Sequence, residues 1–183
     1  MRKGVLFSGL AAVCFAGSCS ILHASDRGEY VYVESNLSAP NSNSIYAFQR
    51  TSGGNLTRVP GSPFLTGGAG VQYAGFNLGP LDSDQEVITN PEHTLLFAVN
   101  AGSDSIAVFR IDEDGSLKPV EGSPFPSGGS DPVSLALYGN VLFVANQSGD
   151  FARPSTTLPN YTAMRVERNG YLVPIDNDTN NTS

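Results

Sequence analysis

The sequence predicts an all-β fold built from repeated antiparallel sheets, and two kinds of repetition carry that prediction. The first is a run that alternates at period two and leads through a turn into a Gly-x-Leu triplet, which is the pattern of a β-hairpin. This run occurs three times, as SIYAFQR at 44–50, SIAVFRI at 105–111 and YTAMRVE at 161–167. The second is an eight-residue phrase that occurs as GSPFLTGG at 61–68 and as GSPFPSGG at 122–129. Such duplicated phrases indicate that the surrounding units are copies of one another.

Each hairpin follows an apolar strand that leads into an asparagine. The three strands are YVYVESN at 30–36, LLFAVNA at 95–101 and VLFVANQ at 141–147. Asn36, Asn100 and Asn146 are expected to close these strands in structural roles, because asparagine tolerates left-handed backbone and bonds to its own turn. The second and third units carry one more strand ahead, EVITN at 86–90 and VSLALY at 133–138. The first unit lacks this strand.

Four-stranded antiparallel sheets repeated along a chain are the blades of a β-propeller, in which about 4–8 sheets form a ring. We therefore expect about three blades in an incomplete or open arrangement. The expected boundaries are a blade without its first strand at 30–68, a second blade at 84–129, a third at 131–176 and a polar tail at 177–183. The two GSPF segments, 61–68 and 122–129, are expected to cross between blades. Phe64 and Phe125 would then fill the gap between neighbouring blades.

The N-terminus has the pattern of an export signal. Arg2 and Lys3 precede an apolar stretch that small residues follow, so residues 1–24 are interpreted as a signal peptide. The apolar stretch is too short to span a bilayer. The product is therefore expected to be secreted or periplasmic.

Two cleavage sites stay open. A cut after Ala24 releases a free protein. A cut after Ser18 leaves Cys19 as a lipidated first residue, as in a membrane-anchored bacterial lipoprotein, although such signals normally carry leucine where this chain has Ala16.

Composition excludes several classes of partner. The 183 residues include 10 Lys and Arg against 17 Asp and Glu, for a net charge of −7. No basic stripe is present to neutralise phosphates, so a nucleic-acid partner is not expected.

Both cysteines lie within the first 19 residues, so the body of the chain has no intrachain disulfide. No His, Cys or Asp cluster has zinc-ligand spacing, and neither a metal nor a cofactor is expected.

Two stretches carry a resemblance to a known family. They are NPEHTLLFAVNAGSDSIAVFRIDEDGSLKPVEGSPF, which begins at Asn90, and DPVSLALYGNVLFVANQSGD, which begins at Asp131. They resemble the blades of the lactonase-type seven-bladed β-propellers, the 6-phosphogluconolactonase-like family, in which an apolar strand leads to V-x-N and then to a strand followed by G-x-L. The likeness covers roughly Tyr30 to Ile175. It implies a propeller fold with ancestry in the hydrolysis of a sugar lactone.

Related blades also build propellers that only bind, so the alternative function is a non-catalytic surface for a carbohydrate or protein ligand outside the cytoplasm. Members of the resembling family carry about twice as many blades as the units counted here. We expect this chain to be a piece of a longer gene product. The alternative is that copies associate through open blade edges to complete a ring.

Lactone hydrolysis needs a group that activates water and a donor or cation that holds the developing oxyanion. The candidate catalytic residues are two carboxylates beside the predicted inner strands, Glu86 and Asp131, and two cations of the third unit, Arg153 and Arg165. Each also has a structural alternative: Asp131 as the turn before a proline, for example, or Arg165 on a solvated strand face. These residues do not make a complete catalytic set, so the chain as given is expected to be inactive.

Two further motifs are interpreted as turns. His93 lies in the turn NPEHT and is expected to be a solvated turn residue. The acidic run IDEDGS at 111–116 resembles part of a calcium loop but lacks the glutamate of the twelfth position, so it is interpreted as a hairpin turn.

Overall fold

The computed structural model describes residues 28–72, 86–149, 157–175 and 180–181. The expected signal segment 1–24, with Cys19, and the candidate Arg153 lie outside these ranges. The described residues form three antiparallel sheets, none closed into a barrel, and their one helical segment is a short 3₁₀ turn, Ala101–Ser103. The all-β prediction is confirmed. No helix within the described ranges is long and apolar enough to cross a membrane.

Sheet 1 comes from the first repeat unit, and no described strand precedes its first strand. It contains β1 (Glu29–Glu34), β2 (Ser44–Arg50), β3 (Leu56–Arg58) and β4 (Phe64–Leu65). The order is β1-β2-β3, and β3 and β4 pair with opposite ends of β2.

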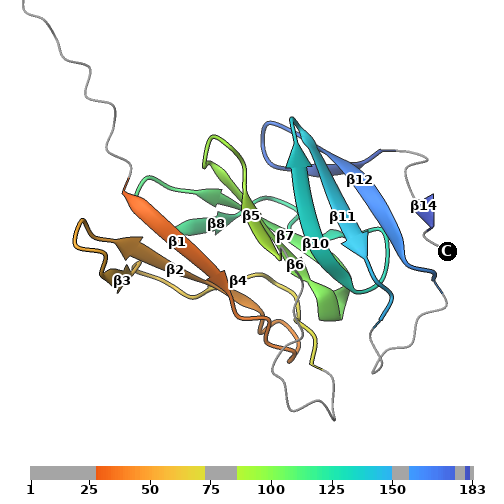
Figure 1. The fold of residues 1–183 in the computed structure, drawn as a ribbon, viewed down its shortest axis with the longest axis horizontal. Helices are drawn as coiled ribbons and strands as arrows, with labels where there is room; N and C mark the ends of the chain where they lie inside the picture. Colours follow the sequence, from red (N-terminus) through yellow and green to blue (C-terminus); the bar gives the residue numbers. More distant parts are fainter. Residues whose placement is uncertain (1–27, 73–85, 150–156, 176–179, 182–183) are drawn as a thin grey trace, which may run out of the picture.

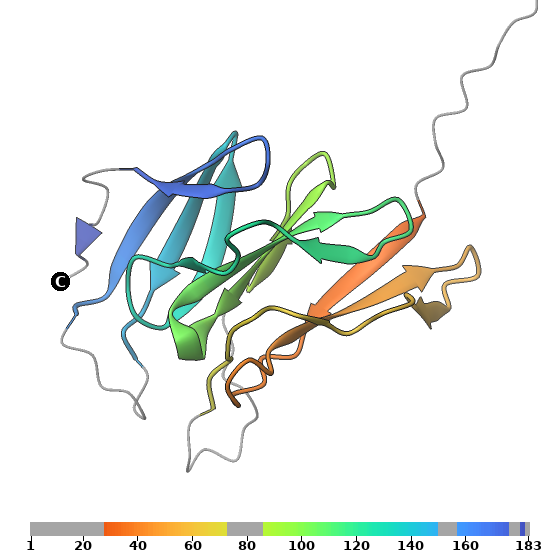
Figure 2. The ribbon, with the colours of Figure 1, turned by 180° about the vertical axis from the view of Figure 1, so that it is seen from behind.

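Sheets 2 and 3 repeat this plan with one more strand at the start. Sheet 2 contains β5 (Val87–Thr89), β6 (Leu95–Asn100), β7 (Ser105–Ile111), β8 (Leu117–Pro119) and β9 (Phe125–Pro126). Sheet 3 contains β10 (Pro132–Tyr138), β11 (Val141–Asn146), β12 (Asn160–Val166), β13 (Leu172–Pro174) and β14 (Asn180–Asn181). The three sheets follow one another side by side (Figures 1 and 2), an arrangement compatible with consecutive propeller blades.

Strand β14 lies within the expected polar tail, 177–183, which therefore contributes to a sheet. It pairs with Asn160 and Tyr161 at the start of β12, just as β9 pairs with Ser105 and Ile106 at the start of β7. The third unit thus returns to its own sheet at the same place as the second. Backbone pairing needs no apolar side chain, so two asparagines form a strand that alternation does not reveal.

The three Gly-x-Leu hairpins share one turn geometry. Gly54, Gly115 and Gly170 have φ values of +84°, +77° and +87°. In each turn the glycine N–H donates to the carbonyl three residues earlier, and that earlier residue's N–H donates to the carbonyl of the residue after the glycine. This is a hairpin turn with a glycine bulge, a backbone conformation that strains any residue with a Cβ.

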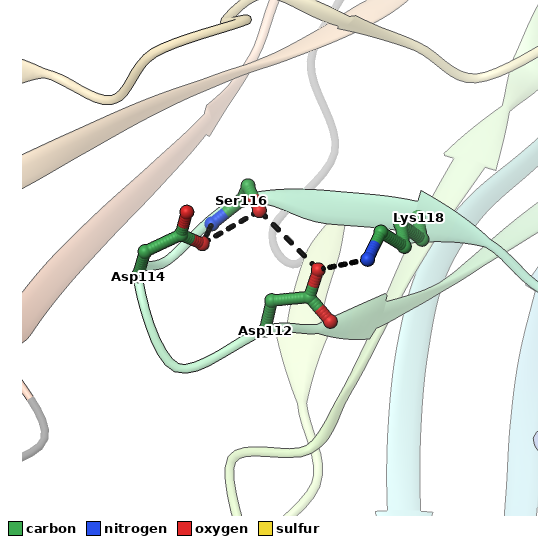
Figure 3. A network of polar contacts seen from close by, with 4 residues as sticks. All are labelled: Asp112, Asp114, Ser116 and Lys118. Atoms are coloured by element: carbon green, nitrogen blue, oxygen red, sulfur yellow. Dashed lines mark hydrogen bonds and ion pairs between the residues drawn. The ribbon is translucent and has the colours of Figure 1, made fainter.

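The second hairpin carries the acidic run, and Figure 3 shows its polar contacts. Asp114 Oδ1 accepts a hydrogen bond from Ser116 Oγ at 2.6 Å, and Lys118 Nζ lies 2.7 Å from Asp112 Oδ2. The hydrogen bonds from Ser116 lower the pKa of the Asp114 carboxyl, and the hydrogen bond to Asp112 raises the pKa of Lys118. The interpretation of residues 111–116 as a hairpin turn is confirmed.

Two apolar clusters join the sheets. The first cluster packs Tyr32, Ile45 and Phe64 of sheet 1 against residues of sheet 2 that include Leu96 and Phe109. The second joins sheet 2 to sheet 3, and its members include Phe97, Ile106, Phe125, Leu135, Leu142 and Met164. The expected gap-filling roles of Phe64 and Phe125 are confirmed. We call the face of a sheet that packs on the following sheet its forward face, and the face that packs on the preceding sheet its rear face.

Each GSPF segment returns to its own sheet before it crosses to the next one. Ser62 Oγ accepts a hydrogen bond from the Ala47 N–H at 2.9 Å, and Ser123 Oγ accepts one from the Val108 N–H at 2.8 Å. The phenylalanine that follows then starts β4 or β9. The expectation of a plain crossing was therefore incomplete, because the segment first completes the outer edge of the sheet it leaves.

Asn100 and Asn146 close β6 and β11 as expected, but the equivalent position in sheet 1 belongs to Ser35. The Ser35 N–H donates to the Ser44 carbonyl at 2.9 Å and so extends the pairing of β1 by one residue. Asn36 comes one residue later, in left-handed backbone with φ +50°. The expectation for Asn36 is off by one position, because Ser35 takes the register position that Asn100 and Asn146 have in the other sheets.

Candidate functional site

The junction between sheets 1 and 2 holds a cluster of polar side chains around Glu34, the last residue of β1. Asn43 Nδ2 donates to Glu34 Oε1 at 2.6 Å and to Asn100 Oδ1 at 2.9 Å. Thr66 Oγ1 donates to the same Asn100 oxygen at 2.6 Å. Asn43, Thr66 and Asn100 are all buried. The cluster therefore ties the end of β1 and the return segment of sheet 1 to the end of β6.

Glu34 is the perturbed acid of this cluster. Burial raises the pKa of its carboxyl well above the ordinary value of 4.5, against the hydrogen bond from Asn43, and the negative charge of Glu86 adds to the rise. Glu34 Oε2 is buried and has no hydrogen-bond partner among the described residues. Desolvation favours the neutral acid, so Glu34 keeps its proton at a pH where an exposed glutamate is ionised. A neutral carboxyl beside a second acid is the arrangement from which a general acid works.

The predicted candidate Glu86 lies in this junction, directly before β5, and its charge acts on Glu34. Sequence reasoning missed Glu34 itself. The sequence does distinguish this residue, because Glu34 takes the register position that Val99 has in sheet 2 and Ala145 in sheet 3. A charge that interrupts an apolar alternation at one copy of a repeat marks a position with a separate role.

The predicted candidate Asp131 lies at the other junction, between sheets 2 and 3. It is fully buried with φ +58°. Its Oδ2 accepts a hydrogen bond from Gln147 Nε2 at 2.9 Å, and its N–H donates to Asp104 Oδ1 at 2.8 Å. These contacts shape the chain as it enters β10, which agrees with the structural alternative for this residue. Glu86 and Asp131 thus belong to different junctions.

The remaining candidates lie apart from both carboxylates. Arg165 is near the end of β12, where its half-exposed side chain pairs with Glu167 at 2.7 Å between Nε and Oε1. Arg153 is outside the described residues. His93 lies in a turn with φ +52°, as predicted, and its Nδ1 is 3.3 Å from Thr89 Oγ1. Within the part of the chain that the structure describes, no three His, Cys, Asp or Glu side chains are grouped to hold a metal ion.

A cleft of about 420 Å³ opens between sheets 1 and 2 near the start of β1, at the end of that strand away from Glu34. Its walls include Tyr30, Tyr32, His93 and Glu113. Tyr32 Oη donates to the Gly115 carbonyl at 3.0 Å, and burial raises the pKa of Tyr32 to about 12. The cleft combines aromatic rings with an acidic rim, which suits a polar ring or a cation better than an anion.

Comparison with known proteins shows which solved structures share this fold. No protein-family profile and no curated protein matches the chain. The periplasmic gluconolactonase of Pseudomonas aeruginosa matches with a TM-score of 0.56 and 20% identity, over 87% of this chain and 41% of that one. A protein of Bacteroides fragilis provisionally named a 6-phosphogluconolactonase matches with a TM-score of 0.55 and 18% identity, over 82% of this chain and 35% of that one. A protein of Lactobacillus plantarum matches with a TM-score of 0.54 and 18% identity, over 84% of this chain and 41% of that one.

The chain spans between 35% and 41% of the length of these three neighbours. At such identities the likeness shows the fold and not the chemistry. Sheets 1 to 3 therefore share the fold of a group of solved structures that includes lactonases.

Proposed function

We propose that this chain is an exported propeller segment of lactonase ancestry that does not hydrolyse lactones by itself. The fold shared with a periplasmic gluconolactonase supports the ancestry. The observation that carries the second part is the separation of the candidate groups. Glu86 acts on Glu34 at the first junction, whereas Asp131 is bonded into the second. Lactone hydrolysis needs its acid or base and its oxyanion donor within reach of one substrate.

A hydrolysis assay tests this proposal. The full chain is incubated with 6-phosphoglucono-1,5-lactone and with glucono-1,5-lactone, beside the Glu34→Gln and Glu86→Gln variants and a protein-free blank. We expect all rates to equal the spontaneous rate. A wild-type rate well above the blank, lost in the Glu34→Gln variant, would assign catalysis to the first junction and overturn the proposal.

A second candidate function is binding of a carbohydrate outside the cytoplasm, and the cleft beside Tyr30 and Tyr32 favours it. Aromatic rings with polar tips are suited to the mixed apolar and hydroxyl surface of a sugar ring. The chain has no tryptophan, so tyrosine fluorescence, to which Tyr30 and Tyr32 of the cleft contribute, can be followed directly. Titration with D-glucose should give a saturable change that Glu113→Gln reduces and that exposed Glu121→Gln leaves intact. A linear response in the wild type would remove this candidate.

Export is part of the proposal and rests on the charged and apolar N-terminus. Expression of the full chain in a bacterium, followed by fractionation and intact-mass measurement, tests it. A product that begins after Ala24 is a free exported protein, and an acylated product that begins at Cys19 is a lipoprotein. Cys19→Ser abolishes acylation in the second case only. An uncut chain in the cytoplasm would contradict export.

A further inference from the structure

The forward face of sheet 3 exposes apolar positions that are buried in sheet 2. Phe143 of β11 is 39% exposed and Tyr161 of β12 is 42% exposed. Their register equivalents in sheet 2, Phe97 and Ile106, are fully buried against sheet 3. The same face therefore serves as a junction in one copy of the repeat and lies open in the next.

The rear face of sheet 1 shows the complementary feature. Leu56 is 53% exposed, whereas its equivalents Leu117 and Leu172 are 4% and 2% exposed. Val33 is 49% exposed, whereas its equivalent Ala98 is fully buried. In sheets 2 and 3 this rear face is covered by the preceding sheet.

The hairpin turns show the same difference between sheet 1 and the other two sheets. A Cβ at Gly115 would lie 2.2 Å from Tyr30 Cδ1 of sheet 1, and a Cβ at Gly170 would lie 2.8 Å from Val120 Cγ2 of sheet 2. Each of these turns thus rests against the preceding sheet. At Gly54, the matching turn of sheet 1, no described atom lies within 4 Å of the same Cβ position.

An arginine marks the forward side of the junction. Arg110 Nη2 of sheet 2 donates to the Asn169 carbonyl at 3.0 Å, in the hairpin turn of sheet 3. Arg165 takes the register position of Arg110 in sheet 3. The candidate cation of the sequence analysis therefore corresponds to a residue that joins one sheet to the next.

We propose that two copies of this chain associate head to tail, with the forward face of sheet 3 in one copy against the rear face of sheet 1 in the other. Phe143 and Tyr161 pack against Val33 and Leu56 of the second copy, and Arg165 reaches the carbonyls of its Gly54 turn. The occupant is a second copy because sheet 1 carries the turn and the apolar rear face that sheets 2 and 3 use at the same contact.

A contact of this kind is heterologous, so it closes into a ring or grows into a filament. The described residues of two copies contribute six sheets, which lies within the range of about 4–8 sheets that closed propeller rings contain. We therefore expect a dimer.

Molecular mass in solution tests the association. Analytical ultracentrifugation of the full chain over a wide concentration range should give twice the monomer mass of 19.2 kDa. Tyr161→Lys and Leu56→Lys should each weaken association by about tenfold or more. The matched control is Leu158→Lys, which alters a 55% exposed leucine in the loop ahead of β12 and should leave the mass unchanged. Circular dichroism and thermal melting of each monomer confirm that the variants fold.

Mixing the variants tests the polarity of the contact. Each variant keeps one intact face, so Tyr161→Lys and Leu56→Lys should form a heterodimer with each other that neither forms alone. A symmetric contact through the edge of β1 cannot be restored in this way. A wild type that stays monomeric at every concentration, or blocked variants that dimerise as well as the wild type, would overturn the proposal.

Discussion

Gly68 lies against the side-chain amide of Asn100, so closely that a Cβ at residue 68 would come within 2.3 Å of Asn100 Cγ. Gly129 stands in the same relation to Asn146, with 2.5 Å between the corresponding atoms. The last glycine of each GSPF segment thus packs on the asparagine that ends the second strand of the following sheet. Two repeated sequence features, the Gly-Gly pair and the strand-end asparagine, are the two sides of one contact.

Gly68→Ala should destabilise the chain by about 1–3 kcal/mol, because the added methyl group overpacks the buried amide of Asn100. Urea denaturation of the two proteins measures the change. Gly53→Ala is the matched control, since the nearest atom to a Cβ at residue 53 is 3.9 Å away. Equal stability of Gly68→Ala and Gly53→Ala would contradict this contact.

Ser62→Ala and Ser123→Ala should each lower the free energy of unfolding by about 1–3 kcal/mol. Each change removes the hydroxyl that accepts the Ala47 or the Val108 N–H and leaves that donor unpaired. The two losses should be similar, because the two contacts are copies. Ser52→Ala, in an exposed turn, provides the baseline for a serine hydroxyl in solvent. A loss at one site only would show that the two GSPF segments are not equivalent.

Glu34 should make stability depend on pH in a defined direction. Its folded pKa is raised above the ordinary value of 4.5, so its contribution is fully present below pH 4.5 and is lost as pH rises through the folded pKa. Glu34→Gln should flatten this decline, and the variant should become more stable than the wild type at high pH. Melting temperatures recorded across the pH range measure the effect, with exposed Glu121→Gln as control. A wild type that becomes more stable than Glu34→Gln as the pH rises above 4.5 would contradict this prediction.

Tyr32 should ionise only at strongly alkaline pH. Burial raises its pKa to about 12, with help from Tyr30 and Asp114. Tyr32→Phe should therefore remove a phase near pH 12 from the near-ultraviolet absorbance titration. Loss of the bond to the Gly115 carbonyl should cost about 0.5–1.5 kcal/mol of stability. Tyr138→Phe, at an 83% exposed position, is the matched control. Loss of the same phase in both variants would contradict the burial of Tyr32.

Local patterns were sufficient to predict the sheets. Period-two alternation and Gly-x-Leu turns identified the three hairpins, because a hairpin needs only neighbouring residues to specify it. Phe64 and Phe125 were placed between sheets for a similar reason, since a large apolar residue in a repeated turn has to be buried somewhere. The strand of Asn180 and Asn181 was not predicted, because two asparagines show no alternation of apolar and polar residues.

The polar junctions could not be predicted in the same way. The environment of Glu34 is set by Asn43, Thr66 and Asn100, which sequence distance separates and the junction brings together. The same limit applies to Glu86 and Asp131. Both lie near the predicted inner strands in the sequence, yet the packing of successive sheets assigns them to different junctions.

The central claim is that the repeat units form successive sheets, each of which rests its hairpin turn on the sheet before it. Nuclear Overhauser measurements on isotope-labelled chain test this most directly. We expect cross-peaks between Gly115 Hα and the Tyr30 ring, and between Gly170 Hα and the Val120 methyl groups. A spectrum with the within-sheet contact between Tyr32 and Ala47 but with neither turn contact would contradict it.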